Sequence, residues 1–82
     1  MEYYRRIGDR DVWVTVDKPF VLNEENNQYV ESPRYCCAFK FDKEPGVIVG
    51  QYLREGDELR WFASTNDAAT AAFAEATQRL NE

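Results

Sequence analysis

Aromatic side chains are the sequence feature that most constrains the fold of this chain. Twelve of its 82 residues are aromatic (five Phe, five Tyr and two Trp), whereas only the segment from Asn66 onward has the composition of a helix. One short helix is too small to cover that much ring surface. We therefore expect a sheet that packs one face under the helix and leaves further apolar surface for a partner.

Turn-forming residues interrupt the chain at short intervals, which favours β-strands between them. Pro19 and Pro33 limit strand pairing in the segment around them, and Asn23 to Gln28 reads as a loop. The predicted strands cover residues 2–7, 11–16, 20–22, 28–31, 34–42, 47–54 and 58–64.

The last segment has the periodicity of a helix that begins near Asn66. Ser64 or Thr65 is the expected N-cap, and Asp67 lies in the first turn, where the helix dipole favours an acid. One helical face carries mostly alanine, so this helix should approach a sheet closely. That face consists of Ala69, Ala72, Phe73, Ala76 and Leu80.

Strand alternation predicts which side chains face the helix. If residues 42–46 and 54–58 are both five-residue hairpin loops, Phe39 lies opposite Val49 and Leu53 opposite Leu59, and the apolar residues share one face. The predicted inner face is Tyr35, Cys37, Phe39, Phe41, Val47, Val49, Leu53, Leu59, Trp61 and Ala63. The predicted outer face is Cys36, Ala38, Lys40, Ile48, Gly50, Tyr52, Arg60 and Phe62.

These patterns predict the α+β class: an antiparallel β-meander of four to six strands with one C-terminal α-helix packed on one face. We expect residues 1–82 to form a single domain, because this length allows only one modest core. No apolar run approaches the ~20 residues of a membrane span, and no secretory signal follows Met1, so we expect a cytoplasmic protein.

The formal net charge of −5 disfavours direct binding to nucleic acid or anionic lipid. Net acidity often serves only solubility, but it also favours a basic partner surface. An outer face with Tyr52 and Phe62 among Lys40, Arg54 and Arg60 is a crude match to a nucleic-acid-binding sheet. Because the rest of the chain is strongly acidic, we prefer a protein partner, with no nucleic acid and no membrane.

The sequence contains no recognisable catalytic, metal-binding or cofactor-binding set. There is no histidine, and the four glycines form no phosphate loop. Cys36 and Cys37 are adjacent, so they point to opposite faces of a strand and suit neither a disulfide nor a zinc site. The carboxylate pairs lie in turns, where solvation favours ordinary pKa values over glycosidase-type catalysis. We therefore expect no enzyme, no metal and no cofactor.

The preferred function is a non-enzymatic, acidic protein-binding module whose target is another protein or its own copy as a homodimer. Trp13, Tyr52 and Phe62 are the expected anchors, since aromatic residues dominate binding hot spots. The acids expected to steer toward a basic partner are Glu24, Glu25, Glu55, Asp57 and Glu58.

In size and charge, the chain resembles the small acidic inhibitors of host defence made by phages and the products of mobile gene cassettes. That resemblance implies an inhibitor or accessory protein that acts on a basic, nucleic-acid-handling partner, in one version by mimicking DNA. The alternative is a small-molecule-binding protein with a pocket between sheet and helix, where Gln51 would be the polar group. An enzyme would require a buried pair of carboxylates.

Overall fold

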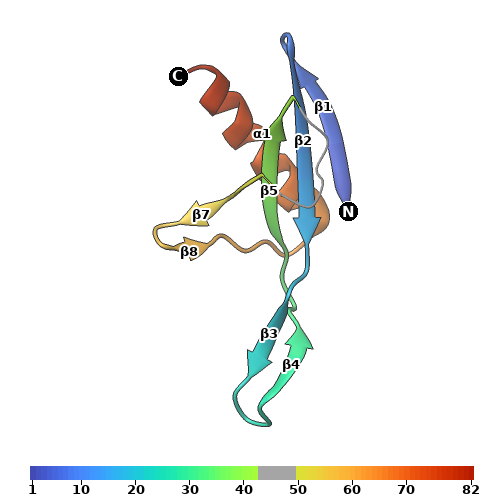
Figure 1. Ribbon diagram of the computed structural model, residues 1–82, viewed down its shortest axis with the longest axis vertical. Coiled ribbons are helices and arrows are strands. Elements are labelled where there is room, and N and C mark those ends of the chain that lie inside the picture. Colours follow the sequence, from blue (N-terminus) through green and yellow to red (C-terminus); the bar gives the residue numbers. More distant parts are fainter. Residues whose placement is uncertain (43–49) are drawn as a thin grey trace.

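In the computed structural model, which describes residues 1–42 and 50–82, a four-stranded antiparallel sheet carries one helix on one face (Figure 1). The strands of this sheet lie in the order β1 (Glu2–Ile7), β2 (Arg10–Asp17), β5 (Cys36–Phe41) and β6 (Gln51–Tyr52), and the helix is α1 (Thr65–Leu80). Two further hairpins are β3 (Phe20–Asn23) with β4 (Gln28–Glu31), and β7 (Arg54–Glu55) with β8 (Glu58–Leu59). The predicted α+β class with an antiparallel sheet and a C-terminal helix is confirmed.

The core lies between α1 and the two central strands. Strand β2 alternates strictly, so that Val12, Val14 and Val16 are buried while the residues between them are half-buried. From α1, Ala72 and Phe73 pack onto these side chains and onto β5. As the alanine stripe predicts, small residues let the helix backbone approach the sheet, and the Phe73 ring fills the remaining space.

The helix begins and ends with recognisable caps. Ser64 has an extended backbone, and its hydroxyl accepts a hydrogen bond from the Asp67 N–H at 3.1 Å. At the other end, the Asn81 N–H donates to the carbonyls of Gln78 and Arg79. Of the two predicted N-caps, the structure selects Ser64, because its side chain satisfies a first-turn N–H that the helix itself leaves unpaired.

Ser64→Ala is expected to lower the free energy of unfolding by about 1 kcal/mol, because the Asp67 N–H loses its acceptor. Urea unfolding followed by tryptophan fluorescence measures the change. Asn66→Ala is the matched control: this exposed first-turn residue makes no cap, so its effect should stay within about 0.5 kcal/mol. Equal losses in both variants would contradict the role of Ser64.

The β5–β6 pairing differs from the expected register by two residues but keeps the expected faces. Phe39 lies opposite Gln51 and Ala38 opposite Tyr52, where Phe39 had been expected opposite Val49. A shift by two preserves the side on which each residue points, since strand side chains alternate with period two. The expected register was therefore wrong by two residues. The predicted loop beyond Asp42 and the predicted strand residues Val47, Ile48 and Val49 lie outside the described residues.

The β7–β8 hairpin departs further from the expectation. Arg54, not Leu53, lies opposite Leu59, a slip of one residue, and the hairpin forms a two-stranded sheet of its own. Leu53 still reaches the core. Phe62 forms an isolated antiparallel bridge with Tyr35, and both side chains pack against the helix-side core. The prediction that Phe62 lies on the outer face was therefore wrong, because the bridge sets Phe62 directly opposite Tyr35, and directly opposed residues of an antiparallel pair point to the same face.

The β3–β4 hairpin continues the central pair β2–β5 away from the helix, and we call residues 20–31 the arm (Figure 1). The ladder is interrupted between the pairs Asp17–Cys36 and Phe20–Glu31, where two residues on one strand oppose four on the other. The Ser32 N–H then donates to the Pro19 carbonyl at 2.7 Å and restarts the pairing. The result is an elongated molecule of 49 × 25 × 21 Å.

The tip of the arm is an ordered turn. The Asn23 side-chain oxygen accepts from the Glu25 N–H at 3.0 Å, and that of Asn26 accepts from the Gln28 N–H at 3.1 Å. Asn27 has a φ of 54°, a left-handed conformation that asparagine tolerates better than most residues. The asparagines that predicted a loop thus build a specific hairpin turn.

Candidate protein-binding surface

Exposed apolar side chains concentrate on the arm. Phe20 is 70% exposed, Tyr29 72%, Leu22 46%, Val30 39% and Val21 37%. Among the described residues, the other large exposed hydrophobic side chains are Met1 and Tyr4. A two-stranded ribbon with water on both sides does not bury its own apolar residues, and such surface usually marks a site of interaction.

The two faces of the arm are unequal. Across the ladder, Phe20 lies opposite Glu31 and Leu22 opposite Tyr29, and these four side chains share one face. The other face carries Val21 opposite Val30, followed by two amide side chains. We call the first of these the arm face (Phe20, Leu22, Tyr29 and Glu31). Because it holds both aromatic rings, it offers most of the exposed apolar surface.

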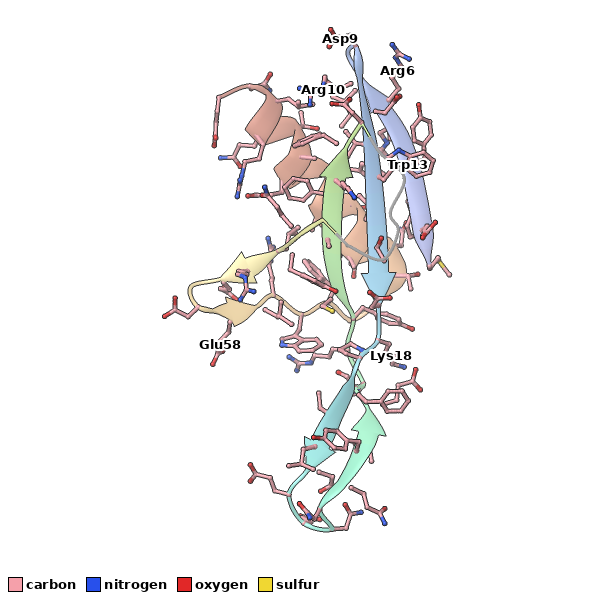
Figure 2. All side chains as sticks on the ribbon, in the orientation of Figure 1. Arg6, Asp9, Arg10, Trp13, Lys18 and Glu58 are labelled. Carbon is pink, nitrogen blue, oxygen red and sulfur yellow. The ribbon has the colours of Figure 1, made fainter. Side chains whose placement is uncertain are left out.

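All five acids that the sequence predicted to steer a partner lie at hairpin tips. Glu24 and Glu25 are exposed at the end of the arm. Glu55, Asp57 and Glu58 are exposed at the turn of the β7–β8 hairpin, which projects in a different direction (Figure 1). Figure 2 shows Glu58 at the end of that hairpin. Both projections of the molecule therefore end in negative charge, and between residues 20 and 31 there is no basic residue to offset it.

Two of the three predicted aromatic anchors lie on the outer face of the sheet. Trp13 lies on β2 opposite Lys40, and its ring contacts that of Tyr4 in a tilted arrangement, with centroids 4.7 Å apart. Tyr52 lies on the same face two strands away, and its pKa is raised by burial and by the nearby charge of Asp17. Both rings are half-buried, so they offer less surface than the arm does.

The sequence did not distinguish residues 20–31 as the main exposed apolar surface. The alternating pattern in residues 20–22 and 28–31 was recognised as β-structure, but nothing local distinguishes a strand under a helix from a strand in water. One signal was available. Two short apolar strands flank a turn of acids and asparagines, and prolines bracket the whole segment at Pro19 and Pro33. Prolines limit pairing to further strands, which favours a hairpin that stands apart from the sheet.

The two cysteines are buried and free. Burial raises the pKa of Cys36, and it raises the pKa of Cys37 to about 11. A cysteine nucleophile requires the opposite, namely a lowered thiol pKa in an accessible, electropositive site. Both cysteines are therefore packing residues of the central strand β5.

In the folded protein, Cys37 is expected to react with a thiolate-selective disulfide reagent about 100-fold more slowly than an unfolded-state thiol, because a pKa near 11 leaves little thiolate at pH 7. Stopped-flow labelling with and without urea measures the ratio. Cys37→Ala isolates the signal of Cys36, which should also be retarded. Labelling of either thiol at the unfolded rate would show that β5 is accessible to solvent.

A hollow of about 370 Å³ lies where the β1–β2 turn meets the end of α1, lined by Ile7, Gly8, Asp9, Arg10, Leu80 and Asn81. It does not include Gln51, whose side-chain oxygen instead accepts from Arg79 Nη1 at 3.1 Å. Arg10, the cation of the hollow, is held by Asp42 at 2.8 Å from Nε to Oδ2, and this contact lowers the pKa of Asp42. The cation that lines the hollow is therefore already paired with a carboxylate outside it, and Asp9 is the acid in the lining.

Within residues 1–42 and 50–82, no group of three or more His, Cys, Asp or Glu side chains is placed to hold a metal ion. No helix among these residues has the length and apolar character needed to cross a bilayer. Comparison of the chain with protein-family models, with curated protein sequences and with solved structures finds no match.

Proposed function

We propose that this chain is a non-enzymatic protein-binding module and that the arm is the element that makes the contact. The observation that carries the proposal is the gathering of five exposed apolar side chains on one projecting hairpin, while the described core contains no residue of the arm. A stable fold has no need of such surface in water, and Tyr and Phe side chains are frequent anchors of protein interfaces.

The charge of the molecule indicates a basic partner. The arm carries Glu24, Glu25 and Glu31 without a base, and the β7–β8 tip adds three more acids. Complementary charge accelerates the encounter of two proteins and disfavours partners of the wrong sign. We therefore propose an inhibitor or accessory protein that acts on a basic, nucleic-acid-handling protein, with the acidic hairpins directed toward it.

Photo-crosslinking from the arm tests this function. A photoreactive phenylalanine at Tyr29 should form covalent protein adducts in an extract of the native host, because this exposed ring is expected to lie in the contact. The matched control places the same group at Thr70, which is exposed on α1, far from the arm in sequence. Adducts should form from Tyr29 and not from Thr70, and they should become fewer as salt is raised.

The charge contribution is tested by the same reaction with Glu24→Lys and Glu25→Lys added. Reversal of these two exposed charges should reduce adduct formation from Tyr29 by about tenfold, since the partner surface is then repelled. Absence of adducts from Tyr29, or equal yields from Tyr29 and Thr70, would overturn the arm as the binding element. The mass of the adduct identifies whether the partner is a different protein or a second copy of the chain.

A further inference from the structure

We infer that the partner adds a strand to the outer edge of β3, so that the arm becomes part of a three-stranded sheet. This inference rests on the proposed function, because it names how the same element binds. The occupant is an extended segment of the basic partner protein. Its apolar side chains lie beside Phe20 and Leu22, and a lysine or arginine lies beside the acidic tip of the arm (Glu24 and Glu25).

The hydrogen bonds of the arm determine which backbone groups point outward. The Ser32 N–H donates to the Pro19 carbonyl, so these two residues form a hydrogen-bonded pair where the arm leaves the sheet. Hydrogen-bonded and non-hydrogen-bonded pairs alternate along an antiparallel ladder. Counted from this pair, Phe20 and Leu22 occupy non-hydrogen-bonded positions. Their N–H and C=O groups therefore point away from β4.

The outer edge of β3 thus presents one donor and one acceptor at Phe20 and again at Leu22. The two residues are about 6.8 Å apart along the strand, since an antiparallel strand rises about 3.4 Å per residue. Both residues are exposed, and β3 has β4 on one side only (Figure 1). An extended segment repeats its own backbone groups with the same spacing, so it can pair with all four.

Strand β3 lacks the protection that other edges of this molecule have. Open edges invite pairing with another chain, and proteins usually block them with charged side chains or proline. The edge strand β1 carries Glu2, Arg5 and Arg6. The opposite edge of the arm, β4, carries Glu31. Strand β3 reads Phe-Val-Leu-Asn, and among the described strands of four or more residues it is the one without a charge.

An added strand would also cover apolar side chains of the arm. Residues of neighbouring strands lie side by side on the same face, so the added segment would pack against Phe20 and Leu22 on the arm face and against Val21 on the other. In this mode of recognition, main-chain hydrogen bonds supply affinity and the alternating side chains supply specificity. The segment that fits β3 is therefore apolar on both of its faces.

Charge at the tip selects a basic segment. Glu24 and Glu25 directly follow β3 and are exposed, and there is no basic residue between residues 20 and 31. At the other end of the strand, Asp17 and Lys18 offset each other, so charge acts mainly at the tip. A lysine or arginine at the tip end of the added segment would meet two carboxylates, whereas an acidic segment would be repelled.

Backbone methylation tests strand addition in the full chain. Residues 1–35 are synthesised and joined to the remainder at Cys36, which allows one peptide nitrogen to be altered. N-methylation of Leu22 removes an outward donor of β3 and keeps every side chain. N-methylation of Glu31 removes an outward donor of β4 and is the matched control. Neither N–H closes the ladder of the arm, so urea unfolding should be the same for both proteins.

The readout is photo-crosslinking in an extract of the native host, with the photoreactive phenylalanine at Tyr29. N-methylation of Leu22 should lower the yield of protein adducts about tenfold, because one hydrogen bond is lost and the methyl group blocks the approaching strand. N-methylation of Glu31 should change the yield by less than about twofold. Peptide mapping of the adduct should place the crosslink in or beside an apolar segment that carries lysine or arginine.

Hydrogen exchange in the protein alone checks whether the edge is open. The Leu22 N–H should exchange near the rate of an unstructured peptide, whereas the Val21 N–H, which bonds across the arm, should exchange about tenfold more slowly. Nuclear magnetic resonance of the labelled full chain measures both rates. Equal protection of Leu22 and Val21 would show that the edge of β3 is already occupied, and it would overturn the inference.

The crosslinking yields separate this inference from the proposed function. Equal yields with and without N-methylation of Leu22 would overturn strand addition and leave the arm as a binding element that acts through its side chains. A greater loss from N-methylation of Glu31 would place the added strand on β4 and would likewise overturn the inference. Absence of adducts from the unmethylated protein would overturn the proposed function and strand addition together.

Discussion

Phe73→Ala should lower the free energy of unfolding by about 3–5 kcal/mol, the largest single-residue loss of stability that we expect in this chain. Its ring is the main large side chain that α1 contributes to the core, where its other buried residues are alanines. It fills the space between the helix and the central strands, and the Arg5 guanidinium lies over it at 4.3 Å. Truncation removes both contacts and leaves a cavity.

Stability scales at about 0.05–0.15 kcal/mol per residue, which gives roughly 4–12 kcal/mol for a chain of this length. Phe73→Ala should therefore remove a large share of the stability of the fold. Urea unfolding by tryptophan fluorescence measures it. Thr70→Ala, one turn earlier and exposed, is the control and should change stability by less than about 0.5 kcal/mol. A loss below 1 kcal/mol for Phe73→Ala would mean that α1 does not pack on the sheet through this residue.

Removal of the arm should abolish binding while the rest of the protein stays folded. Pro19 and Ser32 are already joined by the hydrogen bond from Ser32 N–H to Pro19 O at 2.7 Å. Replacing residues 20–31 with Asn-Gly keeps that bond as the closing bond of a two-residue turn, for which Asn-Gly is well suited. The stability of the body should change by less than about 1 kcal/mol, because the shorter loop costs slightly less entropy to close and no core residue is removed.

Two measurements check this variant. Urea unfolding reports the stability of the body, and chemical crosslinking in an extract of the native host reports binding, which should be lost. Phe20→Ser with Tyr29→Ser in the full chain should lose binding to a similar extent, which separates loss of the two rings from loss of chain length. An excised protein that still crosslinks to a partner would place the contact on another surface, such as the outer face around Trp13 and Tyr52. Unfolding of the excised protein would show that the arm supports the core.

Local patterns predicted which side of the sheet most residues face. In β5, the alternation of Cys37 and Phe39 with Lys40 was sufficient to assign these side chains to the two faces of the sheet. Successive side chains of a strand must point to opposite faces. The helix was equally predictable from its alanine stripe and from the Ser64 cap. These features depend on backbone geometry within a few residues, so the sequence alone carries them.

Register and strand ends were harder to predict. The β5–β6 pairing could shift by two residues without moving any side chain to the other face, so alternation could not distinguish the two registers. Phe62 was assigned to the wrong face because the expected register placed its neighbour Trp61 on the inner face, whereas Phe62 itself bridges Tyr35 there. The bridge joins residues far apart in the chain, and nothing near Phe62 specifies it.

In the candidate site, too, some features follow from local sequence and others depend on contacts between distant parts of the chain. The acids at Glu24 and Glu25 were predicted at a turn, and they lie at one, because asparagine and glutamate disfavour strands locally. That Phe20 and Tyr29 are the most exposed aromatic side chains of the described residues was not predicted. Their strands have the same composition as buried ones. What decides their exposure is the reach of α1, which packs against β1, β2 and β5 but makes no substantial contact with β3 or β4, and the burial of a side chain depends on what lies across from it in space.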